Sequence, residues 1–280
     1  MIGARRTIVG KARRPYQGPG DLVGGASAWG SCARAYSAAF AATSGAMMDL
    51  VDQAGANIVT INCFPTGFVN LAVITAWAST HAVTTINVTK LYDQTGTGNH
   101  FTQATLANMP TLQLNTLNGL PTMVFQSSTG AVTLAAAAVT FNQPFSMSCV
   151  YKRTANTANT ATVLAGQGSS VAIGPGTSGL AEITSPGALT VSAAESIFHS
   201  VQGVFNGASS VVVADGTSAS GNPGVSNITA VALRIGRSSG GTTLDGAIAE
   251  IGIWGALAFS SAQYGNLTTN QRNAYLGYNF

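Results

Sequence analysis

The sequence is poor in charged residues. Only 8% of its 280 residues are Asp, Glu, Lys or Arg, whereas 46% are hydrophobic. Typical soluble proteins carry about 25% charged residues. Intrinsic disorder requires low hydrophobicity together with high net charge, so this composition excludes disorder over the whole chain. The scarcity of Glu and Lys beside frequent Gly and Thr also argues against a coiled coil.

Long hydrophobic runs are absent as well. No stretch approaches the ~20 consecutive apolar residues that a transmembrane helix needs. We therefore expect no contact with a membrane. Residues 1–16 are positively charged but have neither the apolar region nor the cleavage site of a secretory signal.

Cysteine is scarce. Cys32, Cys63 and Cys149 form no close pair and no CxxC motif. A zinc site needs four ligands at a recognisable spacing, and an odd number of cysteines does not suit a secreted disulfide framework. We expect buried free thiols, no metal site and no cofactor.

The few charges are unevenly distributed. Residues 15–25 read PYQGPGDLVGG, a Pro- and Gly-rich composition that predicts an extended linker. We therefore expect a basic extended arm at residues 1–25 and a folded domain at residues 26–280. The arm could dock on a protein partner, bind nucleic acid or be a solvated tail, and we favour docking. Its five cations, all before the first acid, are Arg5, Arg6, Lys11, Arg13 and Arg14.

The pattern of short segments predicts an all-β fold. From residue 111 onward, β-rich segments recur every 8–12 residues or so with Gly, Asn, Ser and Pro between them, which is typical of an antiparallel β-sandwich. We expect helices only near residues 32–42, 70–80 and 269–276, with Asn70 as the N-cap of the second. In the last strand, residues 247, 249, 251 and 253 should share one face.

One segment, LYDQTGTGNH at residues 91–100, resembles a known signature. It is similar to the block at the front of arabinofuranosidase B-type catalytic domains, which also occurs in bacterial and phage proteins without an evident enzyme site. From the residues themselves, an Asx-type turn explains the polar side chains of this loop. The loop residues are Asp93, Gly96, Gly98, Asn99 and His100.

Two further resemblances concern the ends of the chain. Residues 198–216 and the segment DGAIAEI at residues 245–251 look like the C-terminal half of a concanavalin A-like (laminin-G-like) jelly roll. The resemblance implies a jelly-roll sandwich. Residues 2–21 have an arginine-rich start that runs into Pro-Tyr-x-Gly-Pro-Gly-Asp, and this composition resembles that of virion structural proteins of tailed phages.

The arabinofuranosidase resemblance also locates where catalytic carboxylates should be. Glycoside hydrolysis normally uses two carboxylates. The family's nucleophile has an Asp-x-Glu-Asn context, where residues 167–187 offer only Glu182. Its acid/base lies in a Gly-Gly-Asp-Asn stretch, where this chain has Ser238 in Ile-Gly-Arg-Ser-Ser. We therefore expect no catalytic residue and no enzyme.

The remaining acids have structural interpretations. Asp215 and Asp245 each precede Gly, which favours turn residues. Glu250, within the last strand, is expected to be a hydrogen-bonded structural acid rather than a groove residue.

The main functional hypothesis is a phage virion structural protein, either a capsid decoration, a head fibre or a tail component. It would be assembled in the host cytoplasm as a homo-oligomer, anchored by its arm to other virion proteins, with a host surface glycan as a further partner. The alternatives are a carbohydrate-binding module or an arabinofuranosidase-like glycoside hydrolase. In a binding module, sugars would stack on exposed aromatic rings, although core packing is the commoner role of such residues. The candidate rings are Trp254, Tyr264, Tyr275 and Tyr278.

Overall fold

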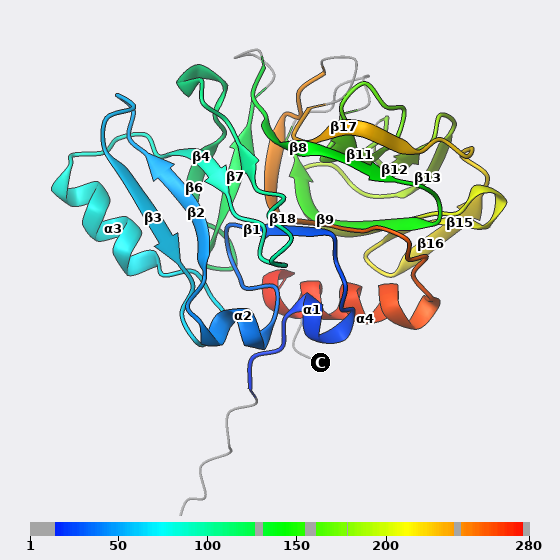
Figure 1. Cartoon of the computed structure of the whole chain (residues 1–280), viewed down its shortest axis with the longest axis horizontal. Coiled ribbons are helices and arrows are strands. Elements are labelled where there is room, and N and C mark those ends of the chain that lie inside the picture. Colours follow the sequence, from blue (N-terminus) through cyan, green and yellow to red (C-terminus); the bar gives the residue numbers. More distant parts are fainter. Residues whose placement is uncertain (1–14, 127–130, 155–160, 178, 238–241, 277–280) are drawn as a thin grey trace, which may run out of the picture.

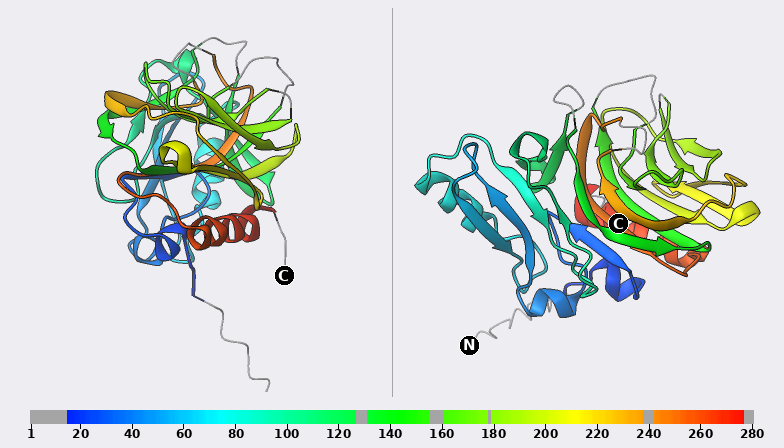
Figure 2. Two further views of the ribbon diagram at one scale, coloured as in Figure 1. Left: turned by 90° about the vertical axis from the view of Figure 1, so that its right-hand side faces the viewer. Right: turned by 45° about the horizontal axis from the view of Figure 1, so that its top comes forward.

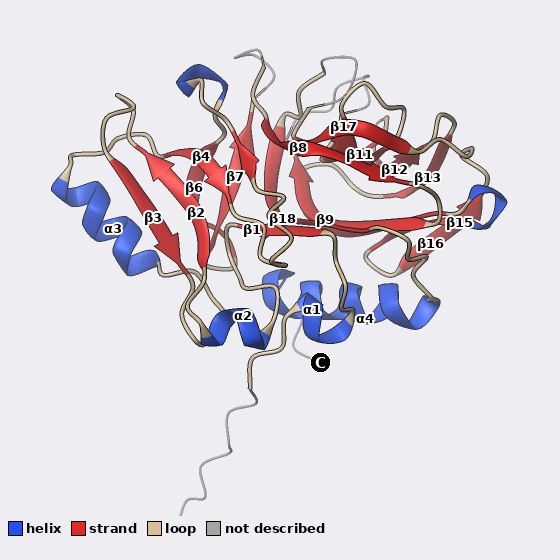
Figure 3. Cartoon of the chain, viewed as in Figure 1, coloured by secondary structure: helices blue, strands red, loops and turns tan. Residues whose placement is uncertain are grey.

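Antiparallel strands dominate the structure, a computed structural model that describes residues 15–126, 131–154, 161–177, 179–237 and 242–276. Figure 1 and Figure 3 show these strands as two layers with short helices around them. The predicted all-β sandwich class is confirmed. Among the described residues, no helix is long and apolar enough to cross a bilayer.

The first layer, here called the long sheet, runs the full width of the molecule (Figure 1). β18 lies at its centre, pairing with β7 and β1 on one side and with β9 on the other. In spatial order its strands are β3 (Ile58–Asn62), β2 (Ala46–Val51), β4 (Asn87–Leu91), β6 (Thr111–Leu117), β7 (Leu120–Phe125), β18 (Gly246–Trp254), β9 (Phe145–Arg153), β14 (Phe198–Phe205), β15 (Ser210–Ala214) and β16 (Thr217–Gly221), with β1 (Ala28–Ser31) beside the second half of β18.

The second layer, the short sheet, covers one half of the long sheet. β5 (Phe101–Thr102) connects the two layers by pairing with β4 and β8. The strands of the short sheet, in spatial order, are β8 (Leu134–Phe141), β17 (Ile228–Ile235), β10 (Leu164–Gly166), β11 (Ala172–Pro175), β12 (Leu180–Thr184) and β13 (Ala188–Ser192).

The main hydrophobic core lies between the two layers. Phe145 of β9 and Phe205 of β14 stack with ring centroids 4.6 Å apart. The layers approach so closely that a Cβ on Gly203 of β14 would lie 2.5 Å from the side chain of Ile183 on β12. Each fully buried aliphatic or aromatic side chain contributes about 1.5–3 kcal/mol, so this interface stabilises the sandwich.

The helices lie outside the sandwich, and α2, α3 and α4 each begin where a side chain caps the first turn. α3 (Leu71–Thr80) begins after Asn70, whose side chain accepts a hydrogen bond from Val73 N, as predicted. α4 (Ser261–Gln271) begins eight residues earlier than the expected helix at 269, because Ser260 and Gln263 form a capping box. It continues as a π-helical turn, η4 (Arg272–Leu276), and covers the outer face of the long sheet, as Figure 2 shows.

The predicted helix at residues 32–42 is shorter than expected. Only α2 (Ala38–Ala42) forms there, beginning after Ser37, whose hydroxyl accepts from Phe40 N. The remaining short elements are α1 (Pro19–Leu22) and the 3₁₀ turns η1 (Leu106–Asn108) and η3 (Gly207–Ser209).

A β-bulge in β18 changes the predicted facing of the last strand. The register shifts between Ile248 and Glu250, so that Ile248, Ile251 and Ile253 all belong to the main core. Trp254 packs in a separate cluster on the other side. The strict alternation expected from the sequence fails here because a bulge inserts one extra residue and reverses the facing beyond it.

Part of the Pro- and Gly-rich segment, residues 15–25, packs into the fold. Tyr16 donates a hydrogen bond to Ala35 O, and Val23 is 2% exposed. The carbonyl of Val23 accepts from Trp254 Nε1 at 3.1 Å. The basic residues 5–14, expected to form the docking arm, lie outside the described residues.

Candidate functional site

The loop of the LYDQTGTGNH motif is built around one carboxylate. Oδ1 of Asp93 accepts from Trp29 N at 3.1 Å, and Oδ2 accepts from Gly98 N at 3.0 Å and from the Thr97 hydroxyl at 2.8 Å. Burial alone would raise the pKa of Asp93, but these hydrogen bonds, with those of Thr95, lower it. Both oxygens of the carboxylate are therefore engaged in closing the loop.

The other motif residues complete this turn. Gly96 and Gly98 adopt φ values of +86° and +85°, which favour glycine. His100 Nδ1 accepts from Asp93 N at 3.0 Å, and Asn99 Nδ2 donates to Ser27 O at 2.8 Å. The Asx-type turn interpretation agrees with this geometry, and the loop ties β1 to the end of β4.

Two of the four aromatic candidates cannot stack on a sugar. Trp254 is 0% exposed and Tyr275 is 1% exposed, so both pack in the interior. Trp254 lies in a cluster with Leu267 of α4, and Tyr275, a residue of η4 itself, packs against strands of the long sheet. Tyr264 is only partly buried and stays a candidate. Tyr278 lies outside the described residues.

Glu250 is a structural acid at the centre of a buried network. Arg34 donates to it through Nε at 2.7 Å and through Nη2 at 2.9 Å, and Gln271 Nε2 donates at 2.8 Å. The Tyr275 hydroxyl donates to it as well. Burial alone would lower the pKa of Arg34, but Glu250 raises it, so the guanidinium stays charged. With every partner buried, the network holds η4 and α4 on the long sheet.

A second paired group, missed by the sequence analysis, joins His199 and Asp215. Nδ1 of His199 lies 2.6 Å from Asp215 Oδ2, and Nε2 lies 2.6 Å from Ala194 O. Both neighbours are acceptors, so both bonds form only when the ring carries two protons. Burial would lower the pKa of His199, but the bonds to Asp215 and Ala194 raise it.

This pair should make stability pH-dependent. Because the folded-state pKa of His199 lies above its unfolded value of about 6.5, the stabilisation is present below that pH and is lost as the pH rises through the folded-state pKa. The loss should not exceed about 1.5–3 kcal/mol, the range for hydrogen bonds to charged groups. Urea unfolding between about pH 6 and pH 9 measures it. His199→Gln should flatten the profile, and the same change at the exposed His81 should not.

Glu182 differs from the other acids in having no partner among the described residues. It lies on β12, paired across the strands with Gly174 and Thr190, and is 9% exposed. Among the residues that the structure describes, no group hydrogen-bonds or pairs with its carboxyl group. Desolvation by burial raises its pKa. Its neighbour Gly176 leaves the carboxyl room, since a Cβ there would lie 2.9 Å from Oε2. Ser238, the residue at the resembled acid/base position, lies outside the described residues.

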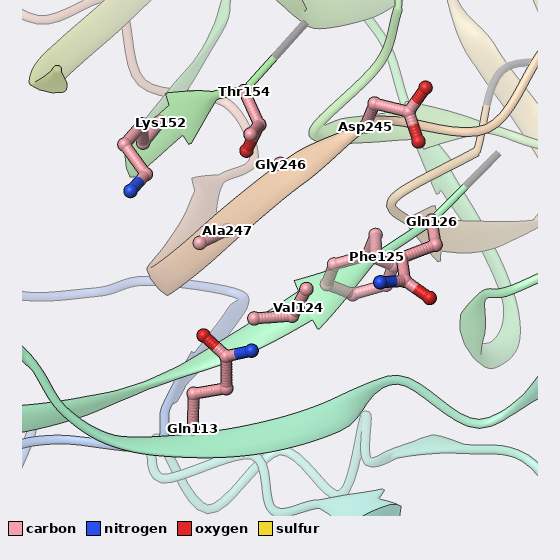
Figure 4. A pocket seen from close by; sticks show the side chains of 9 residues that line it. All are labelled: Gln113, Val124, Phe125, Gln126, Lys152, Thr154, Asp245, Gly246 and Ala247. Atoms are coloured by element: carbon pink, nitrogen blue, oxygen red, sulfur yellow. The ribbon is translucent and has the colours of Figure 1, made fainter. Parts of the chain in front are cut away.

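Two cavities open on the long sheet and share one residue, Lys152. The first has a volume of about 390 Å³ and is drawn in Figure 4. The second has a volume of about 550 Å³. The first is lined by Gln113, Val124, Phe125, Gln126, Lys152, Thr154, Asp245, Gly246 and Ala247. The second is lined by Thr116, Lys152, Ser196, Ile197, Phe198, Asp215 and Arg272. These cavities could not be predicted from the sequence, because strand register brings residues from distant segments together.

The described part of the chain contains no cluster of metal ligands and no reactive thiol. There, no three His, Cys, Asp or Glu side chains gather as ligands for a metal ion. Cys32, Cys63 and Cys149 are buried free thiols. Burial raises the pKa of Cys32 to about 12, which keeps its thiol protonated and unreactive.

Known proteins resemble this chain in fold. No family model matches it, and no curated protein sequence matches it. A GH54 α-L-arabinofuranosidase soaked with 4-nitrophenyl α-L-arabinofuranoside superposes over 92% of this chain with a TM-score of 0.71 and 17% identity. This chain therefore shares the fold of that enzyme.

Two more solved structures agree. A GH54 α-L-arabinofuranosidase soaked with a cyclic sulfate inhibitor matches with a TM-score of 0.70 and 17% identity. An arabinofuranosidase complexed with arabinofuranosyl-α-1,2-xylobiose matches with a TM-score of 0.66 and 16% identity. Each covers 92% of this chain, which spans 66%, 66% and 65% of the three matched chains in turn.

These matches correct the functional hypothesis from the sequence. The expected phage virion role, whether capsid decoration, head fibre or tail component, is wrong, because the structures that share the fold are arabinofuranosidases. The expectation of no enzyme is contradicted by the same finding. The expectation of no enzyme rested on the absence of the family's two carboxylate motifs. A sequence motif can change while the fold stays the same.

Proposed function

We propose that this chain is a carbohydrate-active protein that binds glycans bearing arabinofuranosyl groups and hydrolyses the arabinofuranosidic bond. The observation that carries the proposal is the shared fold, which extends over 92% of the chain with a TM-score of 0.71 to an arabinofuranosidase. The matched structures bind an aryl arabinofuranoside and an arabinofuranosyl xylobiose, which defines the substrate class proposed here.

Glu182 is the residue best suited to the chemistry. It is the only carboxylate in the region where the arabinofuranosidase resemblance puts the nucleophile. Its raised pKa favours the protonated form, and a protonated carboxyl group can donate its proton to the oxygen of the leaving group. An unpartnered, desolvated acid is costly to the fold, which is typical of a functional rather than a structural group.

Asp215 and Asp245 do not supply a catalytic pair. Asp215 follows β15 and Asp245 precedes β18, with β9 and β14 between these two strands. Three strand spacings amount to about 14 Å, whereas the two carboxyl groups of glycosidases lie roughly 5–9.5 Å apart. Asp215 also binds His199.

With one carboxylic acid we expect a slow hydrolase. Glu182 would protonate the glycosidic oxygen, and the bond from this oxygen to the anomeric carbon would break. Water would then attack the anomeric carbon and release a proton to solvent, from which Glu182 is reprotonated. General acid catalysis alone supplies about 10²–10⁴-fold acceleration. A second carboxylate as nucleophile or base would add to that.

The test is hydrolysis and binding by the wild-type chain. With 4-nitrophenyl α-L-arabinofuranoside we expect slow release of nitrophenol above the buffer rate, and with an arabinofuranosyl oligosaccharide we expect saturable binding by calorimetry. The matched 4-nitrophenyl α-L-arabinopyranoside is the control, and it should react at the buffer rate. If the furanoside is neither bound nor cleaved, the proposal fails.

A further inference from the structure

Four neighbouring strands of the long sheet present one row of side chains to the two cavities. Val124 of β7 pairs with Ala247 of β18, Ala247 pairs with Lys152 of β9, and Lys152 pairs with Phe198 of β14. Residues in register on adjacent antiparallel strands point to the same face of a sheet. The two cavities therefore lie side by side on that face, with Lys152 between them.

The size and lining of these cavities suit a sugar. Volumes of about 390 and 550 Å³ fall within the usual range for small-ligand sites, about 300–1,000 Å³. Val124 and Ala247 provide a low apolar floor that the C–H face of a sugar ring can contact. Gln113 and Thr154 lie at the edges of the same cavity, where amide and hydroxyl groups can bind sugar hydroxyls, as Figure 4 shows.

Lys152 brings a charge that no carboxylate in the described part of the chain neutralises. Among the described residues no carboxylate pairs with it, and its Nζ lies 5.1 Å from the centre of the Phe198 ring. In Figure 4, Lys152 and Asp245 lie at opposite ends of the view. Asp215, the acid of the second cavity, is already bonded to His199 at 2.6 Å.

The described lining of the second cavity contains more basic than acidic side chains. Lys152 and Arg272 line it against the single acid Asp215, whose partner His199 carries a second proton when both its bonds form. A cation held beside an aromatic ring at the junction of two sugar-sized cavities favours a ligand that is both a sugar and an anion.

We propose that this Lys152 groove binds an acidic sugar, a glycan unit bearing a carboxylate, with the carboxylate at Lys152 and the sugar ring on Val124 and Ala247 in the first cavity. The inference rests on the proposed function only in taking a carbohydrate as the ligand. The groove lies on the long sheet, whereas Glu182 lies on the short sheet, so the two sites are separate.

The probes are 4-nitrophenyl β-D-glucuronide and 4-nitrophenyl β-D-glucoside, which differ only in the carboxylate. Calorimetry on the full chain at low salt should show at least about fivefold tighter binding of the glucuronide, a modest factor because charges near a surface interact weakly. The preference should decrease as salt screens the charges.

Three variants make the test specific. Lys152→Gln should abolish the preference for the glucuronide, and Lys152→Arg should keep it. Lys90→Gln should also keep it, because Lys90 lies over the ring of Tyr92, at 4.1 Å, on β4 and outside the groove. Thermal unfolding checks that each variant is folded.

Two results would overturn the inference: equal affinity for the two probes, or a preference that survives Lys152→Gln. The wild-type chain gives independent readouts. Hydrolysis of the aryl arabinofuranoside reports the proposed function, and the glucuronide preference reports this groove, so the failure of one is distinguishable from the failure of the other.

Discussion

Replacing Glu250 with Ala is expected to lower the free energy of unfolding by about 3–5 kcal/mol, the cost of breaking a buried ion pair from one side. Arg34 is 1% exposed and Glu250 is 0% exposed. The substitution leaves the guanidinium without the carboxylate that holds it at 2.7 Å. It also removes an acceptor from Tyr275 and Gln271, so η4 and α4 lose their attachment to β18.

Urea or thermal unfolding measures this effect, and two further variants show its cause. Asp49→Asn is the control, because Asp49 accepts from the neutral hydroxyls of Thr60 and Tyr92, and its loss should be below about 1 kcal/mol. The double variant Arg34→Met with Glu250→Leu should recover much of the stability, since apolar residues of similar volume often replace buried ion pairs without loss. A loss below about 1 kcal/mol for Glu250→Ala would show that the network contributes little.

Replacing Glu182 with Gln is expected to abolish hydrolysis, a loss of about 10²–10⁴-fold, because the amide has no proton to give at the pH of the reaction. The same substitution should stabilise the fold at neutral pH. The raised pKa of Glu182 means that its stabilising contribution is present below about pH 4.5. That contribution is lost as the pH rises through the folded-state pKa. Gln keeps the shape of the side chain and removes the desolvated charge.

This opposition between activity and stability separates a functional acid from a structural one. The matched variant Glu195→Gln should lower stability, because Glu195 accepts from Gly179 N at 2.9 Å and pairs with Arg153 at 3.4 Å. Release of arabinose from an arabinofuranosyl oligosaccharide, whose sugar leaving group needs the proton, and thermal unfolding of the same samples give both readouts. If Glu182→Gln unfolds at a lower temperature and hydrolyses at the wild-type rate, Glu182 has no role in catalysis.

Local chemistry could be predicted from the sequence where neighbouring residues determine it. The cap of α3 needs only Asn70 and the three residues after it, and the turn of the YDQTGTGNH motif needs only Asp93 and the amides that follow. The sandwich class followed from the spacing of the short strands. The bulge after Ile248 could not be predicted, because the alternation of side chains along a strand contains no signal for an inserted residue.

The candidate sites could be predicted only in part. Glu250 was expected to be a structural acid, but its partner Arg34 is 216 residues away, and no spacing rule connects them. The pairing of His199 with Asp215 depends on the register of β14 and β15. The position of Lys152 in the groove depends on its neighbours on β18 and β14, strands that follow it by tens of residues. Such groups depend on tertiary structure, which local patterns do not encode.

The central position of β18 has a consequence for how the chain folds during synthesis. β18 pairs with β1, with β7 and with β9, so it joins segments from most of the described chain, yet it is the last of the described strands to be translated. Until it emerges from the ribosome, β7 and β9 have no strand between them, and their exposed edges can pair with other chains. We therefore expect folding to be completed late and slowly, as is usual where long-range strand pairing dominates. The nascent chain would depend on chaperones or on rapid synthesis of β18 to avoid aggregation.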